Sequence, residues 1–186
     1  MQAAYDSGLD VHPLTADRWR DFVDLFERRG PRGGMGIAGN GCWCMWWRER
    51  TGDRERNRRA MNGLVRSGRE PGLLAYEDET AVGWLSLGPR EDFGQLVRSR
   101  TYAPPEPETG VWAIVCFYVH PTDRHRGVNP ALLEAAVDYA RAHGASALEG
   151  YPHARGDFMG APELFQRFGF EPLRTAGPRV VMRRTF

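Results

Sequence analysis

The chain contains 186 residues, of which 41% are hydrophobic and 26% are charged, and this composition is ordinary for a globular protein with a buried core. Its formal net charge is +1, so no global field attracts nucleic acid or an anionic membrane, and we expect neither partner. No apolar run reaches the roughly 18 residues of a bilayer span. Residues 1–12 are polar and lack the apolar middle of a signal peptide. We therefore expect a cytoplasmic protein.

The first part of the chain predicts a short strand at residues 9–13, followed by a helix. Four apolar residues of that helix recur at helical spacing: Trp19, Phe22, Val23 and Phe26. Residues 30–41 contain six glycines and a proline and are expected to form a loop. An aromatic run follows at 42–48, and then an arginine-rich helix at 53–67.

Two strands at residues 73–76 and 81–87 are expected to form a hairpin across an acidic turn. Residues 92–100 predict a short helix. Residues 111–119 are continuously apolar, which is typical of a central strand that is buried on both faces.

The next helix has the strongest signals of any element. Asn129 is a favoured N-cap, Pro130 suits the first helical position, and Gly144 supplies a stop. Its apolar stripe consists of Leu132, Leu133, Ala136, Val137 and Ala140.

The last part of the chain predicts a strand at 146–151, a short helix at 162–168 and a terminal hairpin from 170–173 and 180–184. Strands followed by a strand–helix–strand unit and further strands indicate an α+β fold with a mixed sheet.

The loop between the buried strand and the strong helix has the chemistry of an anion site. A tight turn before a helix directs backbone N–H groups and about half a positive charge at a ligand. Arg124 and Arg126 add charge-assisted hydrogen bonds, and Gly127 allows close approach of the backbone. The same residues also fit an ordinary loop with two solvated arginines, and neither common glycine-rich phosphate motif is present.

This loop resembles the acetyl-CoA signature of the GNAT superfamily, Q/R-x-x-G-x-G/A after a strand that ends V-x-P. The residues that carry the resemblance are Val119, Pro121, Arg124, Gly127 and Asn129. The run 164–170, which ends Gly-Phe, is similar to the family's helix before its terminal strands, and the strand at 82–84 is similar to its third strand. The resemblance covers residues 75–186.

The resemblance implies a mixed, mostly antiparallel central sheet flanked by helices, with a splayed central strand pair. It implies a single domain over residues 1–186, in which 1–70 supply acceptor-side helices and a loop and 71–186 form the CoA-binding core. The pyrophosphate would lie on the loop amides and the pantetheine beside the strand end. The implied cofactor-binding residues are Tyr118, Val119, Arg124, His125, Arg126, Gly127, Val128, Asn129 and Pro130.

The chain departs from the family pattern at two places. Asn129 stands where the family prefers Gly or Ala, and Pro130 after it has no N–H, so we expect phosphate contacts weighted towards Arg124, Arg126 and residues 127–128. We also expect the Asn129 side chain to compete for the free amides of the first helical turn. Where the family often carries a tyrosine that protonates the departing thiolate, this chain has Phe165, which cannot donate a proton.

Acyl transfer to an amine needs a neutral amine and a protonated or tolerated thiolate. On the implied splay, Glu149 is the candidate base, and Tyr151 the candidate acid or substrate contact. Tyr118 is a further catalytic candidate, together with Cys116 and His120, although burial in a strand and a surface loop position also explain these last two.

The run 42–48 contains Cys42, Cys44 and three tryptophans. Trp43, Trp46 and Trp47 are interpreted either as core packing or as an aromatic wall that binds an apolar, aromatic or cationic amine substrate. Structural zinc sites need four ligands and no second cysteine pair exists, so we expect no metal site.

The resemblance implies that the chain is an acyl-CoA-dependent N-acyltransferase, and we expect acetyl-CoA as co-substrate and a primary amine of a small molecule or peptide as acceptor. One alternative is a CoA-binding sensor or regulatory protein with little turnover, which Phe165 favours. Another is an unrelated α/β binder of a phosphate ligand. The sequence leaves the oligomeric state open, with a homodimer as one option.

Overall fold

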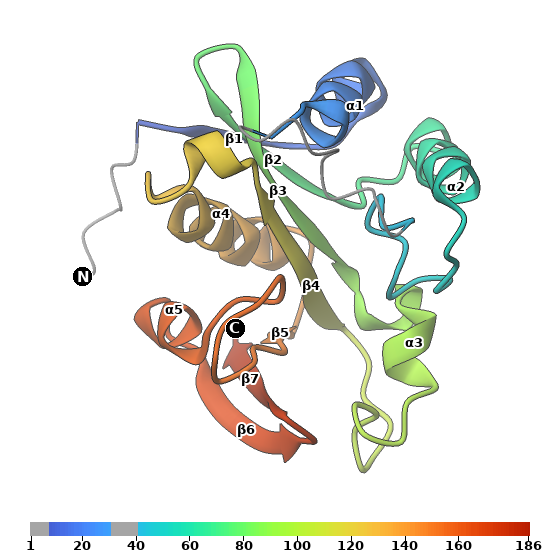
Figure 1. Cartoon of the computed structure of the whole chain (residues 1–186). Helices are drawn as coiled ribbons and strands as arrows, with labels where there is room; N and C mark the ends of the chain where they lie inside the picture. Colours follow the sequence, from blue (N-terminus) through green and yellow to red (C-terminus); the bar gives the residue numbers. More distant parts are fainter. Residues whose placement is uncertain (1–7, 31–40) are drawn as a thin grey trace.

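The computed structural model describes residues 8–30 and 41–186. Its centre is a seven-stranded sheet in the order β1-β2-β3-β4-β5-β7-β6 (Figure 1). The strands are β1 (Asp10–Pro13), β2 (Gly72–Glu77), β3 (Thr80–Pro89), β4 (Val111–Val119), β5 (Ala147–Gly150), β6 (Glu171–Ala176) and β7 (Arg179–Thr185). All neighbours are antiparallel except β4 and β5. This confirms the predicted α+β fold with a mixed, mostly antiparallel sheet.

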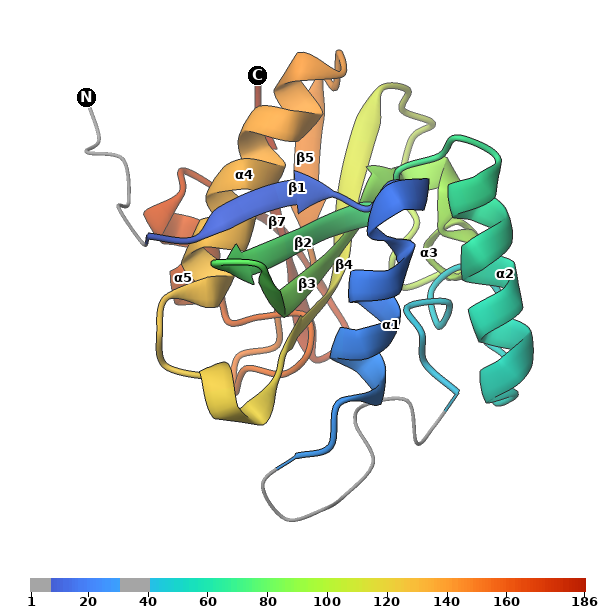
Figure 2. The same cartoon turned by 90° about the horizontal axis from the view of Figure 1, so that it is seen from above.

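Helices cover both faces of the sheet. Figure 2 shows α4 and α5 on one side and α1 and α2 on the other. The helices are α1 (Trp19–Glu27), α2 (Arg54–Arg66), α3 (Gly94–Val97), α4 (Val128–Ala142) and α5 (Pro162–Arg167). None of the helices in the described part of the chain combines the length and the apolar character that a bilayer span requires. Most of the predicted glycine-rich loop, residues 31–40, lies outside the described residues.

The two sides of the sheet have separate hydrophobic cores. The stripe of α4 predicted from the sequence packs on β2, β3 and β4 in the core of one side. On the other side, α1 packs on β3 with the segment after residue 41, and a smaller cluster lies under α3. Strand β4 contributes to all three clusters, which explains why its sequence is apolar without alternation.

A β-bulge in β4 changes the direction in which its side chains point. Ser86 pairs with Cys116 and Leu87 with Ile114, so Val115 is an extra residue without a partner on β3. As a result Ile114 and Phe117, three positions apart, pack in the same core. Cys116 therefore faces the side of α1.

The bulge coincides with the point where β4 and β5 separate. The parallel pairing of these strands covers four residue pairs, from Val111–Ala147 to Ile114–Gly150, and ends there. Beyond Gly150 the chain no longer pairs with β4 and contacts β7 only through an isolated bridge between His153 and Arg179, while β4 continues to Val119 alongside β3. The implied splay of the central pair is thus present in the fold.

A substitution at Gly150, the last residue of β5, tests the packing at the point where β4 and β5 separate. A Cβ there would lie 2.1 Å from the ring of Phe165, which is fully buried. We expect Gly150→Ala to lower the free energy of unfolding by about 1–3 kcal/mol, because the packed ring must shift. The measurement is urea denaturation.

Gly63→Ala in α2 is the matched control, since a Cβ there meets nothing within 4 Å. This change should stabilise the protein by about 0.5–1 kcal/mol through helix propensity. A Gly150→Ala variant as stable as the wild type would show that Phe165 does not pack against β5.

Candidate active site

A cavity of about 1100 Å³ lies where β4 and β5 separate, between the end of β4, the start of α4 and the segment 155–164. Phe117 and Phe158 both line it, next to each other, because the Phe117 N–H donates to the Phe158 carbonyl oxygen. Its wall includes eight of the nine residues predicted to bind the cofactor: Tyr118, Val119, Arg124, His125, Gly127, Val128, Asn129 and Pro130. The fold therefore brings these residues together around one space, although their role in binding stays a prediction.

The first turn of α4 presents free amides to this cavity. The helix begins at Val128 and its N-cap is Gly127, which adopts a φ of +81°, so the prediction of Asn129 as the N-cap is wrong. His125 also adopts a positive φ, +64°, and the loop turns sharply before the helix. Because the first N–H groups of a helix have no intrahelical acceptor, the amides of Val128 and Asn129 can bind an anion, whereas Pro130 has none.

The Asn129 side chain does not act as expected. Its Oδ1 atom is buried and has no hydrogen-bond partner among the described residues, and the cap forms no side-chain hydrogen bond. The expected competition with the helix amides is therefore not observed. The first turn keeps its N–H groups for another acceptor.

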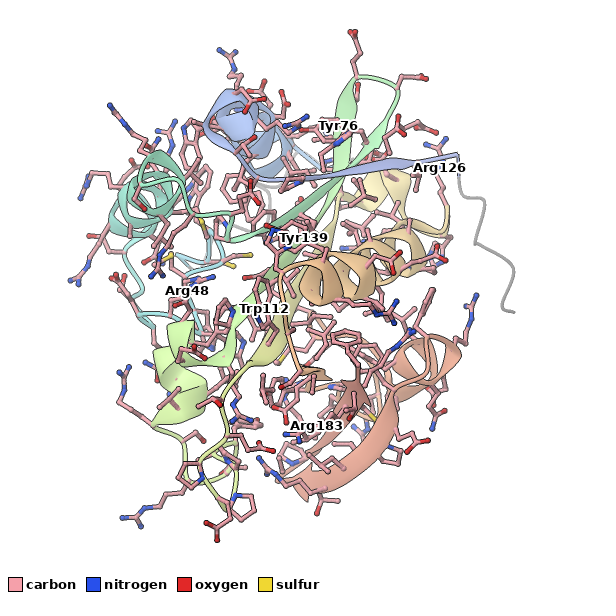
Figure 3. The ribbon with its side chains drawn as sticks, turned by 180° about the vertical axis from the view of Figure 1, so that it is seen from behind. Arg48, Tyr76, Trp112, Arg126, Tyr139 and Arg183 are labelled. Atoms are coloured by element: carbon pink, nitrogen blue, oxygen red, sulfur yellow. The ribbon has the colours of Figure 1, made fainter. Side chains whose placement is uncertain are left out.

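The two arginines of the loop have different positions. Arg124 lies on the cavity wall, exposed, with its Nε 3.5 Å from the Val119 carbonyl oxygen. Arg126, which is labelled in Figure 3, instead forms a two-pronged ion pair with Glu77 at the end of β2, with one contact of 2.7 Å, and it does not line the cavity. Only Arg124 of the two thus lies on the cavity wall, and phosphate binding by either arginine stays a prediction.

The start of the loop is anchored by His120, which is buried rather than a surface residue. Its Nδ1 lies 2.7 Å from the Thr122 hydroxyl and its Nε2 lies 3.3 Å from the Arg29 carbonyl oxygen. Burial and the nearby charge of Arg28 lower the pKa of His120. Asp123 forms an ion pair with the same Arg28. These contacts tie the loop to the end of α1 and make His120 a structural residue.

Along the edge of β4 that borders the cavity, every second residue directs its backbone N–H and C=O groups towards the cavity. The Phe117 N–H donates to the Phe158 carbonyl oxygen at 2.5 Å, and the His120 N–H donates to Val82 on β3 at 3.1 Å. By strand alternation Phe117 and Val119 face the cavity, whereas the backbone of Tyr118 faces β3. The predicted pairing of pantetheine with the backbone of Tyr118 does not match this geometry, because Phe117 and Val119 carry the groups that face the cavity.

Glu149 and Tyr151, the predicted base and acid, belong to a buried polar network instead of the cavity wall. Arg183 donates to Glu149 Oε1 at 2.6 Å, while Arg90 and the Tyr151 hydroxyl donate to Oε2 at 3.3 and 2.6 Å. Burial raises the pKa of Tyr151, and Glu149 and Arg90 modify it further in opposite directions. Because both carboxylate oxygens are engaged and neither residue is exposed, the arrangement argues against their catalytic assignment.

Tyr118, the third catalytic candidate, does line the cavity. Its ring lies on the α1 side of β4, 5.2 Å from the ring of Phe26, and only 5% of the residue is exposed. The structure thus keeps Tyr118 as the single member of the predicted catalytic set that borders the cavity.

The three tryptophans of the aromatic run divide between core and surface. Trp43 is fully buried and stacks on Phe26 with 5.5 Å between ring centroids, so its assignment to a substrate wall is wrong. Trp46 and Trp47 line a second cavity of about 410 Å³. Its other lining residues are Arg50, Gln95, Arg98, Ser99 and Tyr102.

The fold also brings together the three cysteines of the chain. The sulfur atoms of Cys42, Cys44 and Cys116 lie within 4.8 Å of one another. Hydrogen bonds from the thiols of Cys116 and Cys44 lower the pKa of Cys42 to about 3. Sequence reasoning missed this cluster, because the position of Cys116 depends on the bulge in β4, which has no sequence signature.

Glu149→Gln distinguishes a structural role from a catalytic one. Removing the charge leaves two guanidinium groups without their buried partner, so we expect a loss of about 3 kcal/mol in the free energy of unfolding. Affinity for acetyl-CoA should stay within twofold of the wild type. Glu106→Gln, an exposed carboxylate in the neighbouring loop, should change stability by less than about 0.5 kcal/mol. Unchanged stability of Glu149→Gln with lost turnover would restore the catalytic assignment.

Comparison with known proteins agrees with this fold. The sequence model of the Acetyltransferase (GNAT) family matches residues 40–170. No curated protein sequence matches the chain significantly.

Several solved structures share the fold at low sequence identity. The PaiA N-acetyltransferase from Thermoplasma acidophilum, solved with coenzyme A, is 14% identical with a TM-score of 0.57, over 96% of this chain and 99% of the other. A ribosomal-protein-alanine N-acetyltransferase from Brucella melitensis is 17% identical with a TM-score of 0.57, over 95% and 99%. A GNAT family acetyltransferase from the same organism, solved with acetyl-CoA, is 14% identical with a TM-score of 0.54, over 96% and 88%.

The family model covers more than half of the chain, and four of the five signature residues, all except Pro121, line the cavity at the separated strands. The chain belongs to the GNAT acetyltransferase family.

Proposed function

We propose that this protein transfers the acetyl group of acetyl-CoA to a primary amine of a small molecule or peptide, by direct attack in a ternary complex. The observation that carries this proposal is the cavity at the separation of β4 and β5, which combines a helix N-terminus, an exposed arginine side chain and a strand edge. Two of the similar structures were solved with coenzyme A or acetyl-CoA.

The pyrophosphate of the co-substrate would bind at the start of α4. Val128 and Asn129 offer N–H groups there, and the positive φ of Gly127 lets the backbone approach the ligand without a Cβ. Arg124 lies on the same wall and can donate charge-assisted hydrogen bonds. Arg126 is left out of this contact, because Glu77 already neutralises its charge.

The pantetheine would pair with β4 at Phe117 and Val119. This edge is partly covered, since the Phe117 N–H is bonded to the carbonyl oxygen of Phe158. An incoming pantetheine amide must replace that hydrogen bond, so we infer that residues 155–160 shift when the co-substrate binds. The ring of Phe158 is exposed and does not resist this shift, whereas the buried Met159 and the ion pair of Asp157 with Arg179 must adjust to it.

Bound acetyl-CoA supplies an activated thioester. The N–H groups of β4 that face the cavity would polarise its carbonyl, and the neutral amine would form the C–N bond as the C–S bond breaks. The amine proton leaves to solvent, and the thiolate departs as a stable anion or takes a proton from Tyr118. Neither Phe165 nor the paired Glu149 takes part in this step.

The acceptor would bind at the second cavity. Tyr102 lines it and contacts the ring of Tyr151, 5.8 Å away, which places the cavity near the end of β5. Trp46 and Trp47 offer an apolar surface, whereas Arg50 and Arg98 repel a second positive charge. We therefore propose an acceptor that carries an apolar or aromatic group and a carboxylate beside its amine.

The alternative function is a CoA-binding sensor with little turnover. Three observations favour it: the buried phenyl ring of Phe165, the hydrogen bond between Phe117 and Phe158, and the engaged oxygens of Glu149. A sensor would bind acetyl-CoA without an acceptor-dependent reaction.

Calorimetry with acetyl-CoA tests the co-substrate site. Arg124→Ala should weaken binding by about 1.5–3 kcal/mol, the range for hydrogen bonds to charged groups. Arg126→Ala is the matched control and should change affinity by less than about 0.5 kcal/mol, because its ion pair is exposed and lies outside the cavity. Absence of binding at near-millimolar acetyl-CoA would overturn the proposal, and equal effects of both changes would overturn the assignment of Arg124.

Thiol release with a panel of amines tests turnover and acceptor class. We expect kcat/KM to be at least tenfold higher for aromatic amino acids than for the corresponding arylalkyl amines, and Arg98→Ala should abolish this preference without weakening acetyl-CoA binding. A reversed preference would contradict the proposed acceptor class. Tight binding of acetyl-CoA with no release for any amine would favour the sensor.

A further inference from the structure

The three cysteines of the chain form one cluster on the α1 side of β4. Their sulfur atoms all lie within 4.8 Å of one another. Cys44 and Cys116 are buried, whereas Cys42 is half-buried and gives the cluster access to solvent. The chain has three cysteines in total, so its entire thiol content is gathered at a single point. Proximity in the sequence does not explain this arrangement, because Cys42 and Cys44 come from a loop far from β4 along the chain.

Two local features of the backbone direct these sulfurs inward. The bulge at Val115 turns Cys116 towards α1. In the loop, Trp43 and Cys44 both adopt positive φ angles, +32° and +52°. Two consecutive residues other than glycine in this region are unusual and cost energy, so the surrounding contacts hold them there. The resulting tight turn places Cys42 and Cys44 on the same side.

The cluster also has donors of the kind that support metal-bound thiolates. The Cys44 N–H lies 3.3 Å from the Cys42 sulfur, and the indole N–H of Trp84 donates to the Cys44 sulfur. Such outer hydrogen bonds orient sulfur ligands and stabilise their negative charge. The guanidinium groups of Arg54 and Arg58 lie over the Trp43 ring, 5.4 and 5.6 Å from its centroid, and add positive charge beside the turn.

We propose that Cys42, Cys44 and Cys116 bind one divalent cation of the zinc type as three thiolates. Thiolate–zinc bonds of about 2.3 Å require sulfur–sulfur distances near 3.8 Å, so the sulfurs need to approach by about 1 Å or less. Protons that remain on the thiols are released to solvent on binding. Three soft sulfur ligands exclude the hard cations magnesium and calcium.

Three protein ligands leave one position of a tetrahedral zinc ion for water or another ligand. Ser86 is the partner of Cys116 across β3 and β4, so the two side chains lie on the same face. The Ser86 hydroxyl is buried and has no hydrogen-bond partner among the described residues. It is placed to hydrogen-bond a water molecule on the ion. Binding would tie the loop that carries Trp46 and Trp47 to β4 and so stabilise the second cavity.

Cobalt substitution in the reduced full-length protein tests this site. After chelation under anaerobic conditions, one equivalent of Co(II) should produce thiolate-to-cobalt charge transfer and the visible bands of tetrahedral cobalt, and Zn(II) should displace it. Zn(II) should also protect all three thiols from a thiol reagent and raise the melting temperature. Cys42→Ser and Cys116→Ser should each weaken Zn(II) binding at least a hundredfold in competition with a chromophoric chelator.

Met45→Leu is the matched control, because it removes a neighbouring buried sulfur atom that is not a proposed ligand. It should leave the metal affinity within threefold of the wild type. Absence of cobalt charge transfer in the wild-type protein, with three thiols reacting equally with and without Zn(II), would overturn the proposal even if a variant failed to fold. Loss of two thiols on mild oxidation, with no metal uptake by the reduced protein, would identify the cluster as a disulfide-forming site instead.

Discussion

The separation of β4 from β5 is the constraint on which the rest of the structure depends. Pairing ends at Ile114 and Gly150, and the bulge at Val115 comes directly after it. A bulge increases local twist and interrupts regular alternation. It therefore does two things at once. It adds twist where β4 leaves β5 and its edge comes to border the large cavity, and it shifts the alternation of the following residues, so that Phe117 joins the core of Ile114 and Cys116 faces α1. The candidate active site and the thiol cluster lie on either side of this single irregularity.

Ion pairs determine which charged side chains remain available to contact a ligand or to transfer a proton. Glu77 engages Arg126, and Arg90 and Arg183 engage Glu149, so these groups stabilise the fold instead of facing a ligand. Arg124 keeps its guanidinium on the cavity wall. A carboxylate between two guanidinium groups is well placed to hold β5 to its neighbours. It is poorly placed to accept a proton from an amine, because its lone pairs already accept hydrogen bonds.

The position of the loop before α4 at the large cavity could be predicted from the sequence because its residues are contiguous. Gly127, Arg124 and the helix that follows them form one local unit, and a helix N-terminus binds anions wherever it stands. Even there, the N-cap lies two residues earlier than the sequence predicts. Gly127, with its left-handed φ, forms the cap in place of Asn129. The catalytic assignments of Glu149 and Tyr151 could not be judged from sequence. Their partner Arg90 comes from the segment after β3, and such pairings are set by the packed fold.

The sequence by itself determined the α+β class, the apolar stripe of α4, the burial of β4 and the phosphate-type loop, because each follows from local propensity, periodicity or contiguous residues. Only the tertiary structure decided that Trp43 belongs to the core, that Arg126 is paired with Glu77, and that Cys116 meets Cys42 and Cys44. The physical reason is distance along the chain. These outcomes depend on one extra residue in β4 and on contacts between segments far apart in sequence, and neither has a local signature.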